Sequence, residues 1–154
     1  MLMSRAFAAI GFAAALAAGP AQAGQRVIVK DHFYENLDEQ SCNGSTYICA
    51  LVSDRLPDNR ILKITQVSCY LESTTPLSNI ALSETNDPLG LNLQMLRFLP
   101  TTTTYSNNKY FHTFTQPVDL VARPGRYIRL IAGTSAPAQF FNGGCQITGT
   151  LVPL

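Results

Sequence analysis

The chain has 154 residues and a formal net charge of +1, with 11 basic and 10 acidic side chains scattered along it. A chain of this length suits one domain with its own core. Because no cluster of Lys and Arg is present, the sequence excludes nucleic acid as a partner and disfavours an anionic membrane surface.

Residues 1–23 have the pattern of a secretory signal peptide. Arg5 supplies the positive charge, residues 6–18 form an Ala-rich apolar run, and Ala21-Gln22-Ala23 has the small-x-small form of a cleavage site. A transmembrane anchor would need an apolar run of roughly 20 residues, which this segment does not reach. We therefore expect a bacterial type of export signal, and a single domain over residues 24–154 that is periplasmic or extracellular, without stable membrane insertion.

The four cysteines, Cys42, Cys49, Cys69 and Cys145, all follow the predicted cleavage site. In an oxidising compartment an even number of cysteines indicates two disulfides, with three possible connectivities. A metal site would need paired C-x-x-C spacings or nearby histidines, and neither is present. We predict a local Cys42–Cys49 bridge, a long-range Cys69–Cys145 bridge, no metal site and no cofactor.

The first elements in chain order differ in clarity. Residues 30–40 are polar, contain the only plausible helical turn, and are expected to be solvated, while residues 46–52 indicate an early strand. Residues 61–71 are the strongest strand, rich in β-branched and aromatic residues. Their apolar residues fall in two phases, so we predict a bulge near Thr65 and Gln66 that would place both sets in the core.

Further strands are predicted at short intervals, separated by turns rich in Pro, Gly and Asn: residues 77–83, 91–99, 110–116, 118–121, 127–131 and 145–152. This pattern predicts an all-β, disulfide-stabilised β-sandwich, with the jelly roll as one candidate topology and a small barrel as an alternative.

Strand 91–99 alternates, so that Leu91, Leu93, Met95 and Leu99 are predicted to share the core face. Leu96, Phe98 and Ile131 fall in the opposite phase. A second copy of the chain or a flanking segment would then cover that outer face. The alternative is a bulge that returns these side chains to the core.

Catalytic motifs are missing from the sequence. It contains no G-x-S-x-G, no Gly-rich phosphate loop and no calcium-binding loop. His112 lies in phase with Tyr110 and Phe114, and is expected to be a partly buried strand residue with backbone partners. We therefore predict a protein that is not an enzyme, with a small hydrolase using carboxylates or a lone His as one alternative.

Residues 101–110 are predicted to form a loop that offers hydroxyl and amide groups beside aromatic rings. Its candidate binding residues are Thr103, Thr104, Tyr105, Asn107 and Tyr110. Such groups recognise sugars or protein surfaces, and loops on a rigid scaffold commonly carry binding; the alternative is an ordinary hairpin connection. The function expected from the sequence is a non-catalytic module that binds a glycan, an envelope component or a protein partner. A structural subunit of an envelope assembly, with homo-oligomers, is the second alternative.

Overall fold

The computed structural model describes residues 25–38, 46–87, 93–138 and 141–154. These residues form ten strands and no helix, so the described chain has no helical segment able to cross a membrane. The strands are β1 Arg26–Val29, β2 His32–Asp38, β3 Thr46–Val52, β4 Arg60–Ser73, β5 Leu77–Thr85, β6 Leu93–Phe98, β7 Thr102–Ser106, β8 Lys109–Ala122, β9 Tyr127–Ala138 and β10 Phe141–Pro153.

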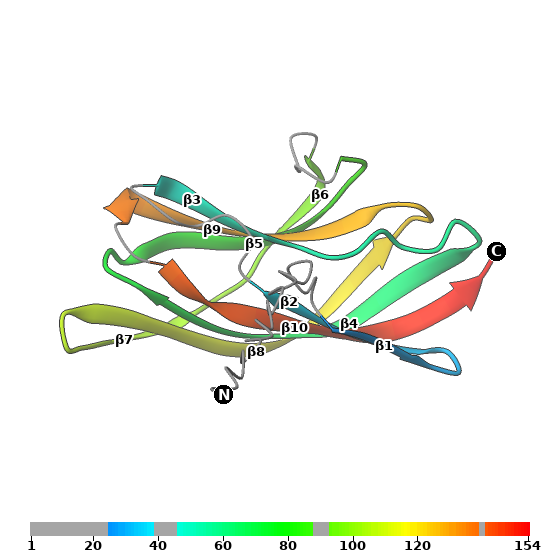
Figure 1. Cartoon of the computed structure of the whole chain (residues 1–154), viewed down its shortest axis with the longest axis horizontal. Coiled ribbons are helices and arrows are strands. Elements are labelled where there is room, and N and C mark those ends of the chain that lie inside the picture. The colour runs from blue at the N-terminus through cyan, green and yellow to red at the C-terminus, as the bar shows by residue number, and fades with distance from the viewer. Residues whose placement is uncertain (1–24, 39–45, 88–92, 139–140) are drawn as a thin grey trace, which may run out of the picture.

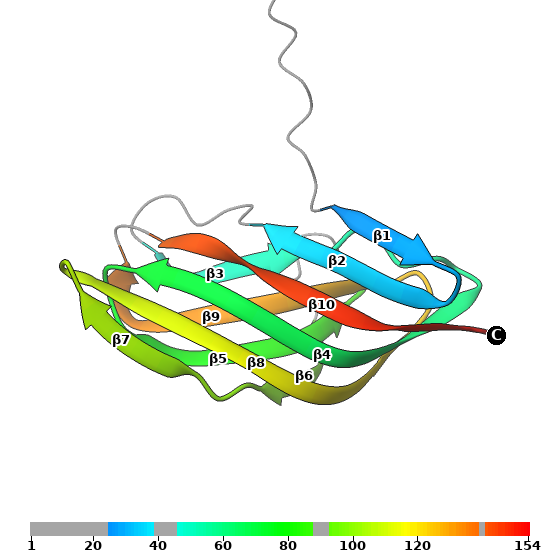
Figure 2. The ribbon, with the colours of Figure 1, turned by 90° about the horizontal axis from the view of Figure 1, so that it is seen from below.

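The strands form two antiparallel sheets that lie one above the other (Figures 1 and 2). The larger sheet has the order β1-β2-β10-β4-β8-β7, and the smaller has the order β3-β9-β5-β6. One cluster of buried apolar side chains draws on both, with Leu62, Ile64 and Ile147 from the larger sheet and Leu51 and Leu130 from the smaller. The core therefore lies between the two layers, and the predicted all-β class is confirmed.

The strongest predicted strand, residues 61–71, forms the centre of β4, and its predicted bulge is confirmed. The register of β4 against β8 shifts between Ile64 and Gln66, and the register against β10 shifts at the same level. Thr65 and Gln66 are both exposed, while Ile64 and Val67 on either side of them are buried. The bulge thus turns both apolar phases of the strand toward the core.

The helical turn predicted within residues 30–40 is wrong, because His32–Asp38 forms strand β2. Phe33, Glu35 and Leu37 all point into the core, as alternate residues of a strand do. Because Glu35 is polar, the sequence does not show the alternation of apolar and polar residues that would indicate this strand. Glu35 is also buried rather than solvated. Arg26 of β1, a strand that the sequence did not indicate, donates a hydrogen bond to it at 2.9 Å.

Two buried carboxylates connect the sheets. Glu35 of β2 accepts a hydrogen bond from the backbone N–H of Asp54, just after β3, at 2.7 Å. Glu84 of β5 accepts one from the backbone N–H of Arg123, just after β8, at 2.9 Å, and also pairs with the Arg123 guanidinium. Burial raises the pKa of Glu35, against the opposing effects of the Asp54 amide and the Arg26 charge. These contacts fix one layer against the other.

Two predicted strands, 110–116 and 118–121, form the single strand β8. Pro117 lies where the register against β4 shifts, a position at which a strand tolerates a residue without an N–H.

Strand β6 is confirmed. Its predicted phase is confirmed for Leu99, which is buried just after the strand, and is wrong for Met95. Met95 has a φ of 57° and is exposed, and the register against β5 shifts beside it. Leu96 and Phe98 are exposed, as their predicted outer phase requires, so the alternative in which a bulge returns them to the core is wrong. Leu91 lies outside the described residues.

The predicted long-range disulfide is confirmed. Cys69 of β4 and Cys145 of β10 pair in register, bond to each other and are buried. Cys49 is also disulfide-bonded, while its predicted partner Cys42 lies outside the described residues.

Candidate functional site

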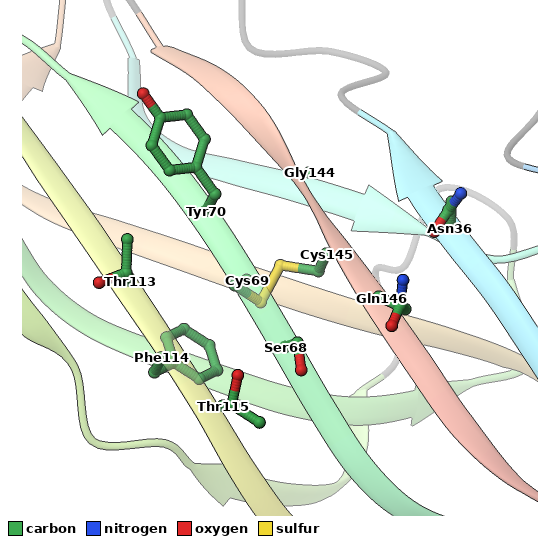
Figure 3. Close-up of a pocket in the computed structure, with 10 residues that line it drawn as sticks. All are labelled: Asn36, Ser68, Cys69, Tyr70, Thr113, Phe114, Thr115, Gly144, Cys145 and Gln146. Carbon is green, nitrogen blue, oxygen red and sulfur yellow. A yellow bond between two sulfur atoms is a disulfide. The ribbon is translucent and has the colours of Figure 1, made fainter.

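The outer face of the larger sheet contains a hollow of about 500 Å³, shown in Figure 3. Its lining residues come from four adjacent strands, β2, β10, β4 and β8. They are Asn36, Ser68, Cys69, Tyr70, Thr113, Phe114, Thr115, Gly144, Cys145 and Gln146.

Strand register explains how these residues meet. Gln146 pairs with Asn36 on one side and with Ser68 on the other, and Ser68 pairs in turn with Thr115. One step along the sheet, Tyr70 pairs with both Gly144 and Thr113. Paired residues of neighbouring strands share a face, so two rows of side chains lie side by side.

Glycine gives the hollow its depth. Gly144 has no side chain, so the Tyr70 ring on β4 and the amides of Asn36 and Gln146 stand apart around it (Figure 3). The Cys69–Cys145 disulfide joins β4 and β10 directly beneath, which holds the floor of the hollow in one geometry.

The chemistry of the lining is uncharged. Asn36 and Gln146 provide amides, Ser68, Thr113 and Thr115 provide hydroxyls, and Tyr70 provides a half-exposed aromatic ring. Donors and acceptors of this kind bind neutral polar groups, and an exposed aromatic face can stack on an apolar ligand surface.

Two contacts position this chemistry from outside the hollow. The Gln146 amide donates a hydrogen bond to the Tyr34 hydroxyl of β2, which orients its carbonyl. The Tyr70 ring lies 6.3 Å, centroid to centroid, from the ring of Phe111 on β8. The Gln146 amide and the Tyr70 ring, on opposite sides of the hollow, are thus held in place before any ligand arrives.

The loop predicted over residues 101–110 is wrong, because these residues form the β7–β8 hairpin. Asn107 and Asn108, with φ values of 49° and 61°, make a two-residue turn with the positive dihedrals of type I′. This is the hairpin connection that the sequence left as an alternative.

The five predicted binding residues therefore lie in one hairpin, outside the hollow. Thr103, Thr104, Tyr105 and Asn107 are exposed, and Tyr110 is half-buried. The rings of Tyr105 and Tyr110 lie 4.7 Å apart, and the Tyr105 hydroxyl donates a hydrogen bond to the Asn108 side chain. Thr104 lies on the opposite face of the hairpin from Tyr105, so the five do not converge on one point.

His112 is fully buried behind this hairpin, and its ring contacts side-chain hydroxyls rather than the predicted backbone groups. Nδ1 lies 2.9 Å from the Thr103 hydroxyl, and Nε2 lies 3.4 Å from the Ser73 hydroxyl. The Ser73 hydroxyl donates to the Thr75 carbonyl at 2.6 Å, so it accepts from Nε2–H. This arrangement matches a neutral imidazole, and burial lowers the pKa of His112.

We predict that His112 lowers the free energy of unfolding of the protein as the pH falls. Because its folded pKa lies below its unfolded value near 6.5, the unfolded chain binds the proton more readily. The contribution of His112 to the free energy of unfolding is therefore complete above the unfolded pKa. It is lost as the pH falls from the unfolded pKa through the lower folded pKa, by at most about 1.4 kcal/mol per pH unit.

Urea unfolding between about pH 5 and 7.5, where histidine titrates, measures the effect. His112→Gln should unfold at a lower urea concentration than the wild type at every pH, and its unfolding midpoint should depend less on pH. His32→Gln, at an exposed position, should leave the pH dependence of the midpoint unchanged. An equal slope in the wild type and in His112→Gln would contradict the assignment.

Sequence reasoning missed the hollow for a physical reason. Its polar side chains occupy ordinary outward positions on four strands, and only the pairing of β10 between β2 and β4 brings them together. The only local signal is the Gly143-Gly144 pair inside a strand, because glycine within a strand often marks close approach or an open site. No family model matches the chain, and no curated protein matches it.

Proposed function

We propose that the protein is a non-catalytic β-sandwich module that binds a glycan, a neutral ligand rich in hydroxyl groups, in the hollow of its larger sheet. The observation that carries this proposal is the lining itself, in which amides and hydroxyls surround an aromatic ring and none of the ten residues carries a charge.

The choice of ligand follows from hydrogen-bonding capacity. A charged ligand entering an uncharged hollow would lose part of its hydration without gaining a counter-charge. Sugar hydroxyls both donate and accept, which matches the amides of Asn36 and Gln146 and the hydroxyls of Ser68 and Thr115. The C–H face of a sugar ring is apolar and can lie against the Tyr70 ring.

The hydrolase alternative has less support. Glycoside hydrolysis uses a pair of carboxylates, and the hollow is lined by none. The most buried acids, Glu35 and Glu84, are engaged by Arg26 and Arg123 between the sheets, and His112 is enclosed by hydroxyls. Among the described residues, no three of the His, Cys, Asp and Glu side chains gather as a metal site would require.

A setting outside the cytoplasm also belongs to this proposal. Export by the segment before Gly24, cleavage after Ala23 and a periplasmic or extracellular place would bring the hollow to envelope glycans. The buried Cys69–Cys145 disulfide supports such a setting, because disulfides persist in oxidising compartments.

Tyr70→Ala tests the proposed site on an array of neutral and charged glycans. Loss of the stacking ring should cost about 2 kcal/mol of binding, or roughly thirtyfold in Kd. Tyr47→Ala removes a similarly exposed tyrosine from β3 of the smaller sheet and is the matched control, with no expected change in capture or melting temperature.

Each outcome has a definite meaning. Capture of neutral glycans that Tyr70→Ala weakens and Tyr47→Ala retains supports the proposal. Loss with Tyr105→Ala alone would move the site to the hairpin. If the wild type captures no glycan, the glycan proposal fails and the structural-subunit alternative takes its place.

A further inference from the structure

The free edge of β7 is regular, exposed and uncharged. All five residues of β7 are exposed, and no charged residue occurs between Pro100 and Asn108. Natural proteins usually protect an edge with a charge, a proline or a bulge. At the other end of the larger sheet, β1 is followed by the charged Lys30. In the smaller sheet, β6 is bulged at Met95 and the register of β3 shifts between Thr46 and Ile48.

The hairpin geometry fixes which backbone groups face outward. A type I′ turn closes with a hydrogen bond between its first and fourth residues, here Ser106 and Lys109. Along an antiparallel pair the direction of these groups alternates. Thr102, Thr104 and Ser106 therefore bond to β8, and the N–H and C=O of Thr103 and Tyr105 point away from it. Within the described residues, no strand pairs with that side of β7.

We infer that two copies of the chain associate by antiparallel pairing of their β7 strands, with Thr104 on the two-fold axis. Outward-facing residues must meet outward-facing residues, so Thr103 pairs with Tyr105 of the second copy and Tyr105 with its Thr103. This register also uses all five residues of each strand, which no other register centred within β7 does.

The side chains suit that register. An aromatic ring faces a β-branched residue where Tyr105 meets Thr103 of the second copy, and two threonines meet at the axis; both kinds of cross-strand pair are favourable. No like charges oppose each other. Each β7 is already extended on its own β8, so association orders no disordered segment.

The second copy is the occupant that the strand itself specifies. An antiparallel pair of identical strands is isologous, so the outward N–H and C=O groups of one β7 bond to the same groups of the other β7. A five-residue pair is much smaller than the roughly 1,200 Å² at the lower limit of standard interfaces. We therefore expect a dimer that dissociates on dilution.

Such a dimer has a geometric consequence for the hollow. The two-fold axis is perpendicular to the joined sheet, so both copies turn the same face outward. From β4 of one copy to β4 of the other there are five strand spacings, about 24 Å in all. Two hollows would then face one surface together, which raises avidity for a repeating ligand.

Introducing a charge at Thr104, on the two-fold axis, tests this inference. The substitution should not disturb the monomer, because Thr104 is exposed. The oxidised full chain is examined by sedimentation over a range of concentrations. The wild type should show a reversible dimer. Thr104→Lys and Thr104→Glu each place like charges about 4.5 Å apart at Cα, and each should weaken the dimer about tenfold or more.

An equal mixture of Thr104→Lys and Thr104→Glu should restore the dimer, because only a pair across the axis brings opposite charges together. Thr65→Lys adds the same charge to the same sheet away from β7, and should behave as the wild type. A monomeric wild type, a Thr104→Lys variant that dimerises as the wild type does, or a mixture that stays monomeric would each overturn the inference.

Discussion

Replacing Cys69 and Cys145 together by alanine should lower the free energy of unfolding by about 4 kcal/mol. The bridge spans a sequence separation of 76 residues, and a crosslink over a loop of that length restricts the unfolded chain strongly. It also joins two adjacent central strands, so the reduced chain loses a constraint on the floor of the hollow.

Urea unfolding of the oxidised wild type and the double variant at one pH provides the comparison. The predicted Cys42–Cys49 bridge closes a much shorter loop, so its double alanine variant is the control and should lose less. A smaller loss for the Cys69/Cys145 variant than for that control would contradict the loop-length argument.

Gly143→Ala should destabilise the protein by about 3 kcal/mol or more, whereas Gly144→Ala should not. Gly143 has a φ of 131°, where side chains are rarely accommodated, and an added Cβ would lie 2.1 Å from the backbone oxygen of Tyr70. Neither the dihedral nor the opposing backbone can adjust cheaply, so strain and overpacking combine. Gly144 instead faces the hollow, where an added methyl group meets space.

The pair of variants separates stability from binding. Gly143→Ala should melt at a markedly lower temperature than the wild type. Gly144→Ala should melt close to the wild type but capture less ligand, because its methyl group would take up space in the hollow. Equal melting temperatures for the two variants would contradict the backbone argument.

Much of the fold was predictable where apolar residues report their own phase. In β4, Leu62 and Ile64 fall in one phase and Val67 and Leu71 in the other, and a single bulge at Thr65 is the economical way to bury all four. The Cys69–Cys145 pairing was predictable for a related reason, since each cysteine continues the apolar phase of its own strand.

The failures have an equally specific origin. Polarity misassigned β2 because Glu35 points inward, where an arginine of the neighbouring strand and an amide of the other layer compensate its burial. Thr102–Ser106 was assigned to a loop because serine, threonine and asparagine suit turns as well as exposed edge strands. The hollow could not be predicted from the sequence, because its residues have the composition of any solvated sheet face. Only the order of the strands in the sheet brings them together.

The place of β10 in the larger sheet bears on when the protein can fold. This strand is the last of the described strands along the chain, yet it lies between β2 and β4, which are themselves not paired with each other (Figure 2). While the chain is being synthesised, β2 and β4 have no template between them, and the partner of Cys69 does not yet exist.

Pairings between such distant segments form slowly, since loop closure must precede the contacts that reward it. The larger sheet of a nascent chain therefore stays incomplete until residues 141–153 have been made. The central position of β10 thus makes the closing of the larger sheet, and of the Cys69–Cys145 bridge, a late step in folding.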